Sequence, residues 1–120
     1  MKKLILKHLT GVVFIICFTN VVSFGQTQME MNTEAGKNYK KSDAKLAIVY
    51  KKVQKETQGE VGKKLLLDAQ RTWIKYKEAH CKSASAIYEG GSMQPLIYLN
   101  CLTEITTERI KQLNNYLIVH

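Results

Sequence analysis

The pattern of apolar and polar positions is helical throughout the chain from Met31 onward. Apolar or small residues recur at steps of three and four, which fits a helix and excludes a strand. They are Ala35, Tyr39, Ser42, Leu46, Val49 and Val53. The opposite face carries lysines, namely Lys37, Lys41, Lys45, Lys52 and Lys55. The pattern therefore predicts an amphipathic first helix with a basic outer face, which is either solvated or in contact with an anionic surface.

A second helix is predicted over residues 63–87, after a turn that Gly59 and Gly62 bracket. Glycine relieves the backbone where a helix ends, so this pair marks the boundary. The expected buried face follows the apolar and small residues at helical spacing, with His80 between two of them. Its members are Leu66, Ala69, Trp73, Tyr76, Ser83 and Ile87. Trp73, the only tryptophan, is expected to be a core anchor, with a ligand platform as the alternative.

A third helix is predicted from near Pro95 to about residue 119. Gly90 and Gly91 end the second helix, Pro95 suits the first turn of a new one, and Ser92 is placed to cap it. The expected inward positions are Leu102, Ile105, Ile110, Leu113 and Leu117. No stretch reads as a strand, so the predicted fold class is all-α: an antiparallel three-helix bundle.

The N-terminus has the pattern of a secretory signal peptide over residues 1–25. Lys2, Lys3 and Lys7 precede an apolar run, and Ser23-Phe24-Gly25 offers small residues for a cut before Gln26. A retained membrane anchor is the alternative, but the apolar run is short for a spanning helix. Cys17 lacks the small neighbours that lipoprotein processing needs. We therefore expect export to the periplasm or the medium, with no stable membrane anchor.

The mature chain of residues 26–120 is basic. Eighteen Lys and Arg less the three lysines above leave 15 against 10 Asp and Glu, a net charge of +5. Such a surface attracts anionic partners, and a cell-wall component is a candidate. Export makes nucleic acid the least expected partner.

Two cysteines remain after cleavage, Cys81 and Cys101. An even count in a small exported domain predicts one disulfide, which here ties the end of the second helix to the start of the third. A loop of this size should stabilise the fold by about 3 kcal/mol. The alternative, a metal site with His80 and Cys81, lacks ligands, because the other mature histidine is the terminal His120.

No catalytic constellation, phosphate loop or cofactor motif is apparent, so we expect no enzyme activity and no cofactor. Glu104 and Glu108 share a helix face, but such pairs are usually surface groups. The candidate partner-binding loop lies between the second and third helices, where flanking helices and the disulfide would limit the entropy lost on binding. The alternative is a turn that binds nothing. This 88–94 loop comprises Tyr88, Glu89, Gly90, Gly91, Ser92, Met93 and Gln94.

An ordered set of residues across the mature chain resembles the LprI-like lysozyme-inhibitor domain, a family of small secreted bacterial helical proteins. The set comprises Gln28-Met29-Glu30-Met31-Asn32, Ala35, Ala69-Gln70-Arg71-Thr72-Trp73-Ile74, Cys81, Tyr88 with Gly90-Gly91-Ser92, Cys101, Thr106 or Thr107, Arg109 and Leu113. Relatives often carry a cysteine where this chain has Glu34, so a bridge at that position is absent here.

The resemblance implies binding to lysozyme, although no short inhibitory motif transfers residue by residue. Many lysozymes are strongly basic, so a partner of +5 is repelled at long range unless an acidic patch, around Glu89 or at Glu104 with Glu108, meets it. The sequence predicts an exported, non-catalytic binding protein of the bacterial envelope. Its partner is another envelope protein or an anionic cell-wall component. The alternative is a lysozyme inhibitor that acts through the 88–94 loop.

We expect mass spectrometry of the exported protein to show a chain that starts near Gln26, because the signal-like pattern ends there. Recovery of residues 1–25 intact in a membrane fraction would contradict this cleavage.

Overall fold

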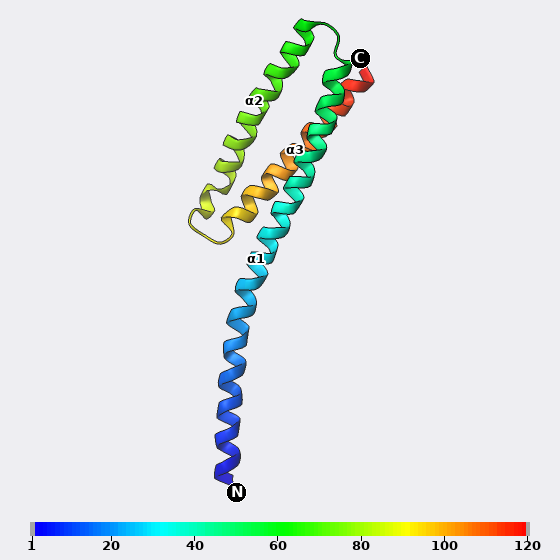
Figure 1. The fold of residues 1–120 in the computed structure, drawn as a ribbon. Coiled ribbons are helices and arrows are strands. Elements are labelled where there is room, and N and C mark those ends of the chain that lie inside the picture. Colours follow the sequence, from blue (N-terminus) through cyan, green and yellow to red (C-terminus); the bar gives the residue numbers. More distant parts are fainter. Residues whose placement is uncertain (1, 120) are drawn as a thin grey trace. The chain divides into compact units, whose positions relative to one another are not determined.

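The backbone of residues 2–119 is helical apart from two short connections (Figure 1). The computed structural model describes the backbone of these residues and the side chains of residues 27–118. The elements are α1 (Lys2–Glu56), α2 (Glu60–Ser85), a 3₁₀ turn η1 (Ala86–Tyr88) and α3 (Gln94–Val119). The described backbone contains no strand, which confirms the all-α fold class.

The chain divides into two compact units, Met1–Met31 and Asn32–His120. The first unit lies within the N-terminal part of α1, and the predicted signal peptide falls on side chains outside the described residues. The described part of the chain contains no helix that is long and apolar enough to cross a membrane. The second unit holds all the tertiary structure discussed below.

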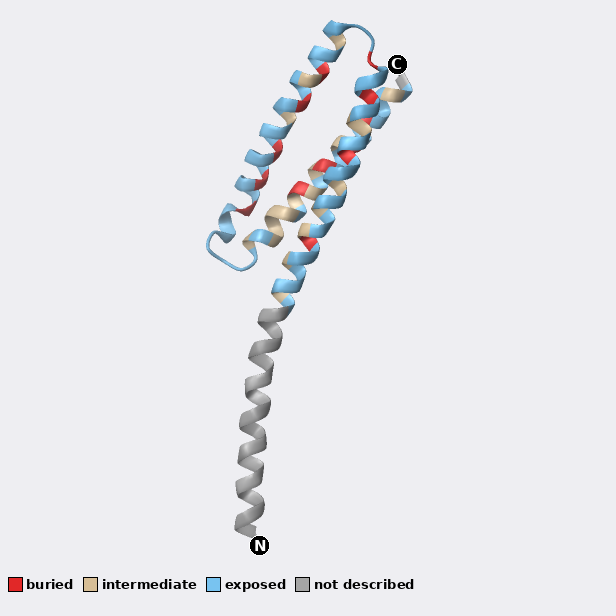
Figure 2. Cartoon of the chain, viewed as in Figure 1, coloured by how far each residue is buried: buried red, intermediate tan, exposed pale blue. Residues whose placement is uncertain are grey.

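In the second unit the chain runs up, down and up again through the three helices (Figure 1). Each helix contributes to one hydrophobic core, which is the physical reason for their association. Figure 2 shows the buried positions as a stripe along each helix. The core contains Leu46 and Val53 from α1, Leu66 from α2, and Ile110 and Leu113 from α3. This packing confirms the antiparallel three-helix bundle.

The predicted faces of α1 are correct. Ala35, Leu46 and Val53 are buried, and Tyr39, Ser42 and Val49 are half-buried. All five lysines of the predicted outer face are exposed. The period of the apolar residues was therefore sufficient to orient this helix.

The predicted buried face of α2 is wrong for most of its residues. Leu66 is buried and Trp73 half-buried, but Ala69, His80 and Ser83 are exposed, as are Tyr76 (55%) and Ile87 (84%). The helix is rotated by about one residue from the predicted orientation. This orientation turns Cys81 inward, where it bonds to Cys101, and places on the same inner face polar side chains that have partners inside the bundle. The residues buried on α2 are Leu66, Gln70, Lys77, Cys81 and Ser85.

The inward positions predicted for α3 are correct. Leu102, Ile110 and Leu113 are buried, while Ile105 and Leu117 are half-buried. Thr106 is also fully buried, on the same face. The helix begins at Gln94, so the residue that precedes it is Met93 rather than Ser92, and the predicted cap at Ser92 is one position early.

A disulfide joins Cys81 on α2 to Cys101 on α3, which confirms the predicted bond. The two Cα atoms are 5.6 Å apart, and the bond closes a loop of 20 residues. Cys81 is fully buried. The bond therefore holds the end of α2 against the first turns of α3, and it closes off the segment that carries the 88–94 loop.

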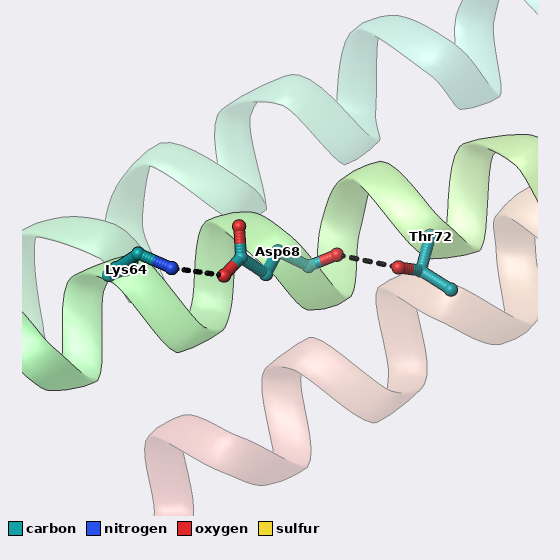
Figure 3. Close-up of polar contacts among 3 residues, drawn as sticks. All are labelled: Lys64, Asp68 and Thr72. Carbon is teal, nitrogen blue, oxygen red and sulfur yellow. Dashed lines mark hydrogen bonds and ion pairs between the residues drawn. The ribbon is translucent and has the colours of Figure 1, made fainter.

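The outer face of α2 carries a local ladder of polar contacts (Figure 3). Lys64 Nζ lies 2.8 Å from Asp68 Oδ2, and the Thr72 hydroxyl donates to the Asp68 carbonyl at 2.9 Å. Hydrogen bonding and charge attraction from Lys64 hold the pKa of Asp68 below its ordinary value. Stability from this pair is present above the unfolded pKa of Asp68 and is lost as the pH falls through the lowered folded value. Both side chains are exposed to solvent, which keeps the contribution small.

We expect Cys81→Ala to lower the free energy of unfolding by about 2–4 kcal/mol, because the unfolded chain is no longer cross-linked. Urea unfolding under oxidising conditions measures this difference. The paired Cys81→Ala, Cys101→Ala variant is the control for a free thiol at Cys101. Unchanged stability in both variants, or free thiols in the wild-type protein purified under oxidising conditions, would contradict the role given to this bond.

Candidate functional site

The predicted 88–94 loop contains a defined β-turn. Glu89 has φ −54° and ψ 129°, Gly90 has φ 77°, and the Gly91 N–H donates to the Tyr88 carbonyl at 2.9 Å. These angles are those of a type II turn, whose third residue has the positive φ that glycine adopts without strain. The turn follows η1 directly, since the Glu89 N–H donates to the Ala86 carbonyl at 3.0 Å.

Two further hydrogen bonds fix the second half of the loop. The Gly90 N–H donates to the side-chain oxygen of Gln94 at 3.3 Å, which closes the turn onto the start of α3. The Asn32 side-chain amide donates to the Ser92 carbonyl at 3.1 Å, across 60 residues of sequence. The loop is therefore held by α1, η1 and α3 together.

The side chains predicted to bind a partner divide into two groups. Tyr88, Glu89 and Met93 are exposed, with Tyr88 at 36% and Met93 at 42%. Gln94 is half-buried and its amide is used within the loop. The structure therefore leaves an aromatic, an acidic and a thioether side chain on the outside of a fixed turn.

A cluster that the sequence reasoning missed lies on the inner face of α2. Lys77 is only 5% exposed, and its ammonium donates to the Tyr39 hydroxyl at 2.9 Å. The same ammonium lies 5.2 Å from the centre of the Tyr39 ring and 4.9 Å from that of the Trp73 ring. Cation–π attraction of this kind is worth up to about 2 kcal/mol when the cation is shielded from water. The cation is held by aromatic groups in place of a carboxylate.

Arg109 of α3 lies against Trp73 too. Its guanidinium carbon is 6.0 Å from the centre of the Trp73 ring. Its Nε donates to the Gln70 side-chain oxygen at 3.1 Å, and its Nη1 donates to that of Gln112 at 3.2 Å. Burial lowers the pKa of Arg109 from its ordinary value. Trp73 thus lies near two basic side chains, Lys77 and Arg109. The groups described in contact with these two cations carry no charge.

A groove of about 530 Å³ runs between α1 and α2 beside this cluster. Apolar and aromatic side chains make up most of its lining, and Arg71, Lys77 and Asp43 bring charge to it. The Tyr50 hydroxyl is buried and has no hydrogen-bond partner among the described residues. The residues that line the groove are Asp43, Leu46, Ala47, Tyr50, Leu67, Gln70, Arg71, Trp73, Ile74 and Lys77.

One sequence signal pointed to the cluster. Lys77, Trp73, Gln70 and Leu66 lie at steps of four, four, three and four before Cys81. A cysteine expected to bond to another helix must face inward, so counting back from it gives the buried face of α2 directly. The apolar pattern pointed elsewhere because it excluded glutamine and lysine from the interior.

No group of three or more His, Cys, Asp or Glu side chains in the described part of the chain could hold a metal ion. Cys81 is engaged in the disulfide, so the alternative site with His80 has lost its sulfur ligand. The His80 ring is exposed, and its centre lies 5.5 Å from that of Tyr76. His120 lies outside the described residues.

The bundle and the disulfide define a small, cross-linked helical domain. The chain belongs to the family described as "Lysozyme inhibitor LprI", whose model matches residues 21–113. It is also similar to the uncharacterised protein R02472 of Rhizobium meliloti (strain 1021), with 33% identity over 99 residues. That alignment covers 72% of this chain and 71% of the relative. No solved structure matches the chain significantly. The family match confirms the resemblance drawn from the sequence, and the family is one of inhibitors, not of enzymes.

We expect Gly90→Ala to lower the free energy of unfolding by about 1–2 kcal/mol, because alanine is strained at a φ of 77°. The loss of stability comes from backbone strain and not from a clash, since a Cβ added at Gly90 would have no atom within 4 Å. Urea unfolding measures it. Ser92→Ala is the matched control, because α3 begins two residues later and Ser92 is exposed. Equal stability of Gly90→Ala and wild type would contradict the described turn.

Proposed function

We propose that the protein is an exported, non-catalytic binding protein that contacts its partner through the 88–94 loop. Lysozyme is the partner to test first, because the family is described as lysozyme inhibitors. The observation that carries the proposal is the fixed shape of an exposed turn, held by hydrogen bonds from Gly91, Gly90 and Asn32. A segment ordered before binding loses less conformational entropy in the complex.

The exposed side chains of the loop supply the contact chemistry of a small binding patch. Tyr88 offers an aromatic ring with a hydroxyl, which is a common anchor at interfaces. Met93 offers an adaptable apolar group. Glu89 supplies a carboxylate, which suits a basic lysozyme. Ser92 and Gln94 serve the loop itself, so the proposed contact rests on three side chains.

The net charge of the protein restricts how a basic partner can approach it. The mature chain carries +5, so a basic lysozyme is repelled at long range, and the attraction has to come from contacts at short range. Screening at physiological salt confines surface charge effects to about 8 Å. Under these conditions Glu89 acts on the partner without strong opposition from the distant lysines of α1.

A second candidate function is binding of an anionic cell-wall component by the lysine face of α1. Lys37, Lys41, Lys45, Lys52 and Lys55 are all exposed. The ion pairs among the described side chains lie on α2 and α3, in Lys63–Glu60, Lys64–Asp68 and Lys111–Glu108. The α1 lysines are therefore available to an external polyanion, and such binding would weaken steeply as salt rises.

For the loop proposal, we expect the paired change Tyr88→Ala, Glu89→Lys to abolish inhibition of lysozyme on a cell-wall substrate while helical content stays the same. The change removes the aromatic anchor and reverses the charge that faces the partner. Direct binding to the same lysozyme is measured alongside. The matched control is Tyr76→Ala, Glu78→Lys, which makes the same substitutions at two exposed positions of α2.

If the folded Tyr88→Ala, Glu89→Lys variant still inhibits lysozyme, the contact lies on another surface of the protein. No inhibition by the wild type across several lysozymes would favour a different envelope partner, and salt-sensitive retention on cell-wall polymer would favour the α1 lysine face.

A further inference from the structure

The groove between α1 and α2 combines an apolar wall with a buried cation. Leu46 and Ala47 from α1 and Leu67 and Ile74 from α2 supply aliphatic surface, and Trp73 adds an aromatic face. Its volume of about 530 Å³ lies within the range of small-molecule sites, about 300–1,000 Å³. The groove involves none of the residues of the 88–94 loop.

Lys77 lines this groove without a carboxylate against it. The contacts described for its ammonium are the Tyr39 hydroxyl and the Tyr39 and Trp73 rings, all of them neutral. An ammonium carries three N–H donors, and one is used by Tyr39. Buried charges are normally paired with an opposite charge. Lys77 therefore presents donors and a positive charge that a ligand anion would complement.

Other charged groups on the groove favour an anion with a single negative charge. Arg71 adds a second positive side chain and Asp43 a negative one, so with Lys77 the lining carries a net charge of +1. Tyr50 also lines the groove, but its hydroxyl oxygen is buried and is not exposed to it. The three charged side chains complement one carboxylate better than a doubly charged phosphate.

We propose that the groove binds a medium-chain fatty acid, with the carboxylate on Lys77 and the alkyl chain along Leu46, Ala47, Leu67 and Ile74. The aliphatic wall matches an alkyl chain, and the charge matches its head. An extended acidic peptide fits less well, because both walls are helices whose backbone groups are already paired and offer it no backbone hydrogen bonds.

The chain contains its own reporter for this binding. Trp73 is the only tryptophan and lines the groove. Decanoate, added to the disulfide-intact protein below the concentration at which it forms micelles, is expected to change Trp73 fluorescence saturably. Decan-1-ol, with the same chain and no charge, is expected to bind about tenfold more weakly, and decyltrimethylammonium more weakly still.

Two alanines of α1 provide a matched pair of variants. Ala47 lines the groove, Ala44 does not, and both are exposed, so glutamate at either position is tolerated by the fold. Ala47→Glu places a carboxylate in the groove and is expected to abolish decanoate binding. Ala44→Glu makes the same change in net charge outside the groove and is expected to bind like the wild type.

A second pair tests the cation directly. Lys77→Met keeps an unbranched side chain and removes the charge, and is expected to weaken decanoate by about tenfold while decan-1-ol binding is unchanged. Lys75→Met, at an exposed position on the same helix, is expected to bind as the wild type does. Helical content and the disulfide are checked in each variant. If Lys77→Met fails to fold, the comparison of Ala47→Glu with Ala44→Glu decides the test.

Several outcomes would overturn the proposal. They are the absence of a saturable response to decanoate, equal affinity for decanoate and decan-1-ol, and unchanged decanoate binding in folded Ala47→Glu or Lys77→Met. Equal loss of binding in Ala44→Glu and Ala47→Glu would also overturn it, because the effect would then follow from net charge alone.

Discussion

The Cys81–Cys101 disulfide sets the rotation of α2 about its own axis, and most other features follow from that rotation. A helix turns by about 100° per residue, so an inward Cys81 brings inward the residues three or four positions before it. Lys77 and Trp73 lie one and two turns earlier on the same face, followed by Gln70 and Leu66. The covalent bond therefore selects a partly polar face for the interior, although a more apolar face was available one residue away.

This selection requires that the interior accommodates Lys77. Removing an ammonium from water costs several kcal/mol even after local relaxation. A charged hydrogen bond to the Tyr39 hydroxyl offsets about 1.5–3 kcal/mol, and the Trp73 ring offsets about 2 kcal/mol or less. Burial of the aliphatic stem adds to this sum. The gains and the cost are of the same size, so the cluster contributes little net stability. Lys77 also lines the groove, where its charge would face the proposed ligand.

The sequence was sufficient for the fold wherever apolar residues alone decided the packing. The faces of α1 and α3 followed from their period, and the disulfide followed from the count of cysteines outside the predicted signal peptide. The turn at Gly90 was also predictable, because only glycine takes a φ of 77° without strain.

The sequence was insufficient where pairs of polar residues from different helices decided the packing. Lys77 meets Tyr39 across 38 residues, and Arg109 meets Gln70 across 39. The sequence of a single helix gives no indication of a partner on another helix. Gln70 and Lys77 were therefore not placed on the buried face of α2. For the same reason, sequence reasoning located the 88–94 loop, which local residues form, and missed the groove, which two helices form together.

The loop and the groove use separate residues but depend on the same helix. Cys81, one turn beyond Lys77, anchors the end of α2 from which η1 and the loop emerge. On the other side, the contact of Lys77 with Tyr39 ties α2 to α1. A ligand that binds only the folded groove stabilises this arrangement, and the stabilisation rises with the logarithm of the ligand concentration over its Kd. Because the same rotation of α2 positions both surfaces, occupation of the groove would stabilise the helix that presents the loop without any contact to the loop itself.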